Sequence, residues 1–364
     1  MGLKSGIVGL PNSGKSSLFK ALTSIDVNIE NFPYTTTESN IGIVNVPDKR
    51  LYKLSEIEKP QKTIPNTVDF IDIAGLAKGA STGEGIGNKF LDQIRHCDSL
   101  IHIIRCFDND SIIHVNNKVD PLSDKEEVDL ELQFKDLESV EKFITKNQKV
   151  AKSGNKEAKF MLDLLLEIKK QLEDGGFVRD MSFNKEELKA IKGFSFLTNK
   201  RTLYVANVGD SDINTGNKYV EQLRESIAKE NSELIFLNAK LEAEIQSLEE
   251  EEKQEFMEMY ELAEPGVNKL INSAYKLLGL ITYFTVGPKE VRAWSTLENS
   301  TAPQAAGVIH SDFEKGFIRA EMIKYDDFIN LGSEQACKDA AKFQVVGKNY
   351  IVQDGDLLHF LFNV

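Results

Sequence analysis

The chain has 364 residues, of which 44 are lysine or arginine and 57 are aspartate or glutamate, giving a formal net charge of −13. This length supports two or three domains, and the acidic balance excludes broad, non-specific nucleic-acid binding while still allowing a local basic patch. The three scattered cysteines form no C-x-x-C pair, which argues against a disulfide framework or a zinc site. With no signal peptide and no apolar run of the ~18 residues that a membrane span needs, we expect a cytoplasmic protein without membrane contact.

The first predicted elements surround a phosphate-binding motif. Residues 3–8 are typical of a buried strand, residues 9–16 read Gly-Leu-Pro-Asn-Ser-Gly-Lys-Ser, and a helix is expected over residues 16–22. This order fits the pattern G-x-x-x-x-G-K-[ST], whose glycines let backbone N–H groups surround phosphates at a helix N-terminus. Lys15 is expected to contact the β and γ phosphates, and the Ser16 hydroxyl to ligate Mg²⁺.

A second phosphate-site motif ends the strand predicted over residues 67–72. Asp72 begins the sequence Asp-Ile-Ala-Gly, in which a carboxylate at a strand end holds a Mg²⁺-bound water and the Gly75 amide contacts the γ phosphate. Residues 35–37, between the two motifs, are three threonines that either complete the Mg²⁺ shell or serve only as turn hydroxyls. Further strands over residues 41–46, 99–106, 202–207 and 233–237 predict one doubly wound α/β sheet with a long interruption.

The interruption, over residues 124–200, is predicted to be helical. Apolar residues recur at helical spacing in two runs separated by a turn-like Ser-Gly-Asn at 153–155: Leu130, Phe134 and Leu137, then Phe160, Leu164, Ile168 and Leu172. We expect an antiparallel helical hairpin whose two stripes form the seam between its helices rather than a ligand pocket.

A base-recognition element is expected directly after the strand over residues 202–207. A guanine reader has Asn-Lys-x-Asp there, whereas this chain has Asn207, Val208, Gly209 and Asp210. Val208 replaces the lysine, but Asp210 keeps a carboxylate that is able to accept from guanine. Residues 238–240, after the last strand, fit the loop that closes over the base.

From about residue 278 the chain becomes rich in strand patterns over residues 281–286, 350–352 and 357–362, which predicts a separate small α+β domain. Lys315, Arg319 and Lys324 are spaced along one segment of it. They are either a local basic cluster that faces RNA or ordinary solvated charge.

These motifs together resemble the Obg-like ATPases, in the YchF branch of the translation-factor GTPases. The resemblance covers nearly the whole chain and includes Asn-Phe-Pro at 31–33, Asp-Ile-Ala-Gly-Leu at 72–76, Gly-Glu-Gly-Ile-Gly-Asn at 83–88, Arg-Cys-Phe at 105–107 and Ile-Ile-His-Val at 112–115. It implies an α/β fold with a P-loop, a doubly wound mixed sheet, an inserted helical hairpin and a C-terminal β-grasp domain of the TGS type. The implied domains are residues 1–123 with 201–277 for the NTPase, 124–200 for the hairpin and 278–364 for the TGS domain.

The resemblance also implies roles for individual residues. Ser16 and Thr36 become the Mg²⁺ ligands, beside Asp72. The phosphates are held by Asn12, Ser13, Gly14, Lys15, Ser16 and Ser17, with Gly75 at the γ phosphate, and the base meets Asn207, the Val208 backbone and Ala239. Leu76 stands where many related enzymes have a water-orienting glutamine, and His114 matches a histidine that the family casts in that role; the alternative is a histidine satisfied by packing contacts.

The function predicted from this pattern is a Mg²⁺-dependent NTPase that hydrolyses ATP slowly and GTP less well, and that acts at the ribosome or a ribosomal subunit in translation or stress response. No specific DNA binding is expected. Two alternatives stay open: a nucleotide-gated binding module in which hydrolysis is incidental, and a GTP-preferring switch, since Asp210 stands where the family usually has glutamate.

Overall fold

A computed structural model describes residues 3–24, 28–30, 40–73, 86–230 and 232–363 of the chain. The chain divides into two compact units, Met1–Val44 with Asp69–Leu270 and Asn45–Val68 with Ile271–Val364. The first contains the phosphate-binding motif, and the second contains the C-terminal residues. Asn45–Val68, predicted above as part of the NTPase domain, thus groups with the C-terminal residues instead.

The first unit is built on a seven-stranded sheet with strand order β2-β3-β5-β1-β6-β7-β8. The pairs from β5 through β1, β6 and β7 to β8 are parallel, whereas β2 pairs antiparallel with β3, so the sheet is mixed. Its strands are β1 (Lys4–Val8), β2 (Asn28–Glu30), β3 (Ile41–Asn45), β5 (Thr67–Asp72), β6 (Ser99–Cys106), β7 (Arg201–Val208) and β8 (Glu233–Leu237). Every residue of β6 is buried, as expected for a central parallel strand that is covered on both faces.

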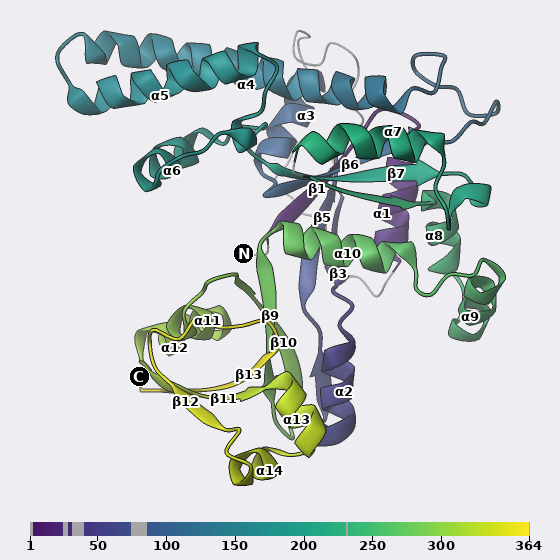
Figure 1. Cartoon of the computed structure of the whole chain (residues 1–364), viewed down its shortest axis with the longest axis vertical. Coiled ribbons are helices and arrows are strands. Elements are labelled where there is room, and N and C mark those ends of the chain that lie inside the picture. The colour runs from purple at the N-terminus through teal and green to yellow at the C-terminus, as the bar shows by residue number, and fades with distance from the viewer. Residues whose placement is uncertain (1–2, 25–27, 31–39, 74–85, 231, 364) are drawn as a thin grey trace. The chain divides into compact units, whose positions relative to one another are not determined.

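Helices cover both faces of this sheet (Figure 1). The helices α3 (Ile86–Arg95) and α4 (Pro121–Ala151) share a core with β1 and β5, and α7 (Lys218–Ile227) packs on β6 and β7. The helix α1 (Lys15–Thr23) packs against α8 (Ala239–Ile245). The remaining helices of this part of the chain are α5 (Lys156–Glu173), α6 (Lys185–Ile191), α9 (Glu250–Met259) and α10 (Gly266–Leu277). This α/β architecture agrees with the predicted fold class.

The helices α4 and α5 lie side by side and project from the sheet (Figure 1). The stripe predicted for α5 is confirmed, because Leu164, Ile168 and Leu172 are buried. The stripe predicted for α4 is wrong at Leu130 and Phe134, which are 47 % and 55 % exposed, whereas Leu137 packs against the core shared with α5. The buried apolar side chains of α4 are instead Val128, Leu132 and Val140. Buried polar and charged side chains of α4 itself occupy much of the same face.

The second unit contains a six-stranded sheet with strand order β12-β11-β13-β9-β10-β4. Its strands are β4 (Lys62–Ile64), β9 (Leu280–Val286), β10 (Glu290–Leu297), β11 (Phe317–Lys324), β12 (Gln344–Val346) and β13 (Asp356–Phe362). One core lies under α11 (Ala302–Ile309) and α12 (Ser311–Lys315), and the other under α2 (Lys49–Glu58), α13 (Tyr325–Leu331) and α14 (Glu334–Asp339). The strand β4 adds to this sheet by parallel pairing with β10.

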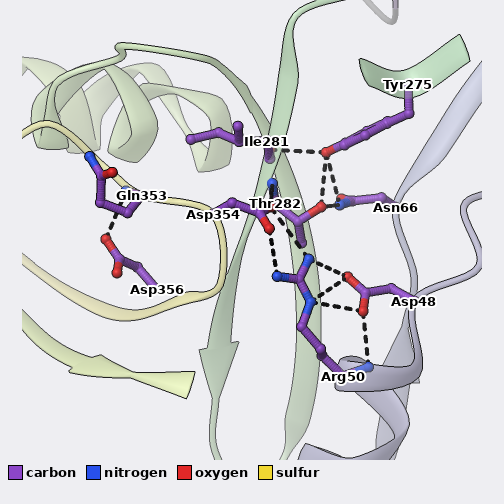
Figure 2. Close-up of polar contacts among 9 residues, drawn as sticks. All are labelled: Asp48, Arg50, Asn66, Tyr275, Ile281, Thr282, Gln353, Asp354 and Asp356. Carbon is purple, nitrogen blue, oxygen red and sulfur yellow. Dashed lines mark hydrogen bonds and ion pairs between the residues drawn. The ribbon is translucent and has the colours of Figure 1, made fainter. Parts of the chain in front are cut away.

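A polar network also ties α2 to the C-terminal strands (Figure 2). The Arg50 guanidinium binds Asp48 at 2.8 Å and Asp354 at 2.6 Å, and Asp354 accepts a hydrogen bond from the Thr282 amide at 2.9 Å. Burial opposes the charge of Arg50, but the hydrogen bonds of the two carboxylates outweigh it and raise the pKa of Arg50. Nearby, Asn66 Nδ2 donates to Thr282 Oγ1 at 3.0 Å. These contacts explain why residues far apart in the sequence form one unit.

Candidate nucleotide-binding site

The phosphate-binding loop joins the carboxyl end of β1 to the first turn of α1. Asn12 has φ 62° and Gly14 has φ 106°, so the loop uses backbone conformations that few side chains tolerate. At Gly14 there is also no room for a side chain, because a Cβ would lie 2.3 Å from Asn207 Nδ2. The predicted strand, loop and helix are therefore all present, and the Gly14 requirement has a steric cause.

Lys15 is buried within this loop. Its Nζ donates to the carbonyl oxygens of Gly9 at 2.9 Å and Leu10 at 2.8 Å. Burial lowers the pKa of Lys15 to about 8, while the negative charge of Asp72 works in the opposite direction. The ammonium group is thus held by neutral carbonyls at the place where the motif puts a phosphate.

The lowered pKa of Lys15 predicts proton uptake when a triphosphate binds. Between pH 8 and 10 much of Lys15 is neutral in the free protein, and phosphate oxygens nearby restore the charged form by raising its pKa. We expect calorimetry at pH 8.5, in buffers of different ionisation enthalpy, to show uptake of a substantial fraction of one proton, and affinity to fall as pH rises above 8. Lys15→Met should abolish the uptake. Equal proton uptake by the variant would contradict the assignment.

The first turn of α1 is open to an anion. Its N-cap residue, Gly14, provides no side-chain cap, and the first turn contains no acidic residue. The Ser13 hydroxyl is buried and has no hydrogen-bond partner among the residues that the structure describes. A helix N-terminus combined with an unpaired buried hydroxyl suits an oxygen-rich anion such as a phosphate.

Asn207, at the end of β7, connects the phosphate loop to α8. Its Nδ2 donates to the Ser13 carbonyl at 2.9 Å, and its Oδ1 accepts from the Ala239 amide at 2.9 Å. Because Asn207 is buried and both ends of its amide are used, it fixes the distance between the phosphate loop and the predicted base loop. The structure therefore brings Ser13, Asn207 and Ala239 together.

The predicted base-recognition residues lie at the same edge of the sheet. The Val208 side chain is buried in the core under α7, and Asp210 is exposed. Asn238, which is predicted only as part of a loop, caps α8 and donates from Nδ2 to Asp210 Oδ1 at 2.6 Å. One oxygen of the Asp210 carboxylate is thus already occupied by a protein donor.

A cavity of about 750 Å³ joins these parts into one site. Its lining includes the predicted residues Asn12, Gly14, Lys15, Ser16, Ser17, Asn207 and Val208. Asp72, at the end of β5, does not line this cavity. Burial raises the pKa of Asp72, and the positive charge of Lys15 works in the opposite direction, so Asp72 and Lys15 interact electrostatically. Thr36, Gly75 and Leu76 lie outside the described residues.

His114 is buried beside α4 and does not line this cavity. Its Nε2 binds Asp124 Oδ2 at 2.9 Å, and its Nδ1 accepts from the Asn116 amide at 3.1 Å. Burial raises the pKa of Asp124, and the hydrogen bond from His114 lowers it. Both ring nitrogens are therefore engaged with the protein in this arrangement.

Sequence reasoning missed how the loop at residues 107–113 is held in place. The buried Arg105 guanidinium donates to the carbonyl oxygens of Phe107 at 3.1 Å, Asn109 at 3.1 Å and Ile112 at 2.9 Å. Asn12 Nδ2 donates to the Ile113 carbonyl at 3.0 Å, so the phosphate loop is joined to the same segment. In the sequence, these contacts are indicated only by the arginine near the end of a buried strand, because a buried charge needs hydrogen-bond partners.

No group of three or more histidine, cysteine, aspartate or glutamate residues suited to a metal occurs among the described residues. All three cysteines, which lie in described segments, are free and buried, in agreement with a packing role. The helices within the described ranges include none with the length and apolarity needed to cross a bilayer.

Comparison with known proteins gives full-length relatives. A family model described as "50S ribosome-binding GTPase" matches residues 4–156, and the C-terminal model of YchF GTPases, described as "Protein of unknown function (DUF933)", matches residues 280–363. Proteins named "Ribosome-binding ATPase YchF" from Haemophilus influenzae, Escherichia coli O157:H7 and Bacillus subtilis are 51 %, 52 % and 49 % identical, covering 100 % of both chains. The solved structure titled "Structure of the Schizosaccharomyces pombe YchF GTPase" is 36 % identical, with a TM-score of 0.88 over 99 % of this chain and 97 % of that one. On this identity and coverage, the chain belongs to the YchF family of P-loop nucleotidases.

Proposed function

We propose that this protein is a Mg²⁺-dependent ATPase that associates with the ribosome. The observation that carries the proposal is the cavity in which Lys15, the open first turn of α1 and the Asn207 bridge meet, because together they provide a triphosphate site with an attached base site. The full-length bacterial relatives are named ribosome-binding ATPases, which supports both the nucleotide and the partner, whereas the solved Schizosaccharomyces pombe relative is titled a GTPase. The reaction is transfer of the γ phosphoryl group to water.

The base site favours adenine. A guanine reader needs a lysine stem beside the base and a free carboxylate, whereas Val208 is buried in the core and Asp210 already accepts from Asn238 at 2.6 Å. Adenine presents an N6 donor and an N1 acceptor, which the peptide groups at Val208 match without a carboxylate. This arrangement removes much of the advantage that Asp210 would give to guanine.

We therefore predict that ATP binds more tightly than GTP and is hydrolysed faster. One buried polar mismatch changes the binding free energy by ~1–3 kcal/mol. A difference of this size between ATP and GTP corresponds to roughly a ten- to hundred-fold preference for ATP. Competition of unlabelled ATP and GTP against a bound fluorescent ATP analogue measures it, with Asp210→Ala as the matched variant. If GTP displaces the analogue at lower concentration than ATP, and Asp210→Ala removes that advantage, then Asp210 reads guanine and the ATP assignment is wrong.

The donor groups at the site fit Mg²⁺. Ser16 lines the cavity, and Asp72 ends the adjacent strand β5, so the pair offers the hydroxyl and carboxylate oxygens that this ion prefers. When bound, the ion would neutralise charge on the β and γ phosphates. We propose Ser16 and Thr36 as ligands with Asp72 holding a bound water, and Gly75 as the amide at the γ phosphate.

Turnover is proposed to be slow unless a partner changes the site. Leucine at position 76 has no polar group to orient water, and His114, the proposed substitute, has both ring nitrogens engaged by Asp124 and Asn116. For His114 to act on the attacking water, one of its ring nitrogens has to give up its present protein partner. The same observation favours the second candidate function, a nucleotide-gated binding module in which hydrolysis is incidental.

The finer domain assignments follow the same proposal. We assign the NTPase core to residues 1–123 and 201–277 without Asn45–Val68, which group with the C-terminal sheet, the hairpin to 124–200 and a TGS-type β-grasp domain to 278–364. The six-stranded sheet with helices on its faces supports a β-grasp domain, extended here by β4 and α2. An ATPase that acts on ribosomes is expected in the cytoplasm.

Co-sedimentation with purified ribosomes tests the partner. We expect the protein to pellet with ribosomes to an extent that depends on whether ADP or a non-hydrolysable ATP analogue is present, and added ribosomes to accelerate ATP hydrolysis. Absence of binding in every nucleotide state would overturn the proposed function. Binding without any change in hydrolysis would favour the gated module.

A further inference from the structure

The end of the helical hairpin is basic in an otherwise acidic protein. We use "hairpin tip" for residues 142–160, which comprise the last part of α4, the connection and the start of α5. This segment contains one acidic residue, Glu157, and six lysines. The lysines are Lys142, Lys146, Lys149, Lys152, Lys156 and Lys159. The whole chain has a net charge of −13, so this concentration of one sign is local.

The lysines of the hairpin tip are exposed, and most are not neutralised. All six are exposed, and Lys142 pairs with Glu138. The other five form no ion pair with any residue in the described ranges. Nearer the base of the hairpin, by contrast, Lys135 pairs with Glu138 and Lys169 with Glu141. Positive charge is therefore left unpaired at the end of the hairpin that lies farthest from the sheet (Figure 1).

We infer that the hairpin tip binds the phosphodiester backbone of RNA. Lysines on two packed helices present point charges at spacings of three and four residues, which suits a row of phosphates and carries no base specificity. Because α4 has 31 residues, it spans about 45 Å, so the tip reaches a surface well away from the nucleotide cavity. This inference rests on the proposed ribosome association and names ribosomal RNA as the surface that the tip contacts.

The residues at the tip favour RNA over an anionic membrane. A membrane-surface helix combines basic residues with a large exposed apolar face. Within residues 142–160, all of them described, Val150 is the sole large apolar side chain that is exposed, and the side chains of Phe143, Ile144 and Phe160 are at least half-buried. The tip therefore offers charge without an apolar face that could insert into lipid.

The alternative basic cluster in the C-terminal segment, Lys315, Arg319 and Lys324, is weaker. Lys324 donates to the buried Asp356 at 2.6 Å and to the Tyr350 hydroxyl at 3.2 Å, so its charge is already used. Only Lys315 and Arg319 remain exposed there. The hairpin tip has more unpaired lysines and greater reach, so it replaces that segment as the candidate RNA contact.

The test compares two triple variants of equal charge change. Lys146→Gln, Lys149→Gln and Lys152→Gln remove charge at the tip, whereas Lys185→Gln, Lys189→Gln and Lys192→Gln remove the same charge at and just after α6, where these lysines are also exposed. Binding to purified ribosomes and to protein-free ribosomal RNA is measured across a salt series. We expect the tip variant to lose about 10- to 100-fold in affinity for both, with a salt slope shallower by about two, and the α6 variant to match wild type.

The possible outcomes separate the two proposals. If wild type binds ribosomes and the tip variant binds them equally with the same salt slope, the inference is wrong and the proposed function stands. If wild type binds no ribosomes in any nucleotide state, the proposed function fails. The RNA-binding inference is then decided by free RNA alone, and equal binding of wild type and tip variant to it overturns that inference. Tighter binding of wild type to phosphatidylglycerol vesicles than to RNA would assign the tip to membranes. Unchanged intrinsic ATP hydrolysis shows that each variant is folded.

Discussion

Lys15→Ala is expected to reduce triphosphate affinity by roughly two to four orders of magnitude. Each hydrogen bond from a charged group contributes ~1.5–3 kcal/mol, and the proposed role of the Lys15 ammonium group is to contact both the β and γ phosphates. In the free protein Lys15 is already desolvated and oriented by the Gly9 and Leu10 carbonyls, so little further ordering is needed when phosphate replaces them. Isothermal titration with a non-hydrolysable ATP analogue measures the loss.

Lys20 provides a matched control on the same helix. It is exposed in the last turn of α1 and forms no ion pair with the described residues. Lys20→Ala should leave the affinity within about threefold, because exposed charges far from the ligand are screened. Unchanged affinity in Lys15→Ala, or an equal loss in both variants, would remove Lys15 from the phosphate site.

His114→Ala is expected to slow hydrolysis by roughly 10- to 1,000-fold, the range of general-base and water-positioning effects, while nucleotide affinity stays nearly unchanged. The variant also leaves the buried Asp124 carboxylate without its donor, which costs about 1–3 kcal/mol of stability. Single-turnover hydrolysis and thermal unfolding, measured on the same preparation, separate the two effects.

Asp124→Asn distinguishes a catalytic role of His114 from a structural one. This variant weakens the partner that holds the imidazole but keeps the imidazole itself. If His114 orients the attacking water, Asp124→Asn should retain hydrolysis within a few-fold of wild type while His114→Ala loses it. Equal hydrolysis in His114→Ala and wild type, with lower melting temperatures in both variants, would show that His114 only supports the loop.

The phosphate site is contained in contiguous sequence, and this explains why it was predictable. A strand, a glycine-containing turn and a helix N-terminus over residues 4–23 need no distant partner to define their geometry. The strand bounds of β5, β6 and β8 also agree with the prediction, because short apolar-rich runs bounded by polar or turn residues identify strands of a buried parallel sheet.

The buried face of α4 depended on tertiary structure. Polar residues occupy that face and are satisfied by distant groups: Lys125 pairs with Glu230, Gln133 donates to the Gly175 carbonyl, and Asp136 accepts from the Leu197 and Thr198 amides. A periodicity that counts only apolar residues therefore shifted the stripe onto the exposed Leu130 and Phe134. Burial of satisfied polar groups leaves no such signal in the sequence.

The sequence by itself predicts a phosphate-binding loop, because the residues of this motif are adjacent in the chain. Tertiary structure decided which distant segments complete each unit. Asn207 joins Ser13 across 194 positions, Arg50 joins Asp354 across 304, and β4 pairs with β10, so residues 45–68 belong with the C-terminal sheet. Such contacts depend on chain topology and on the pairing of buried polar groups, which no local pattern of residues encodes.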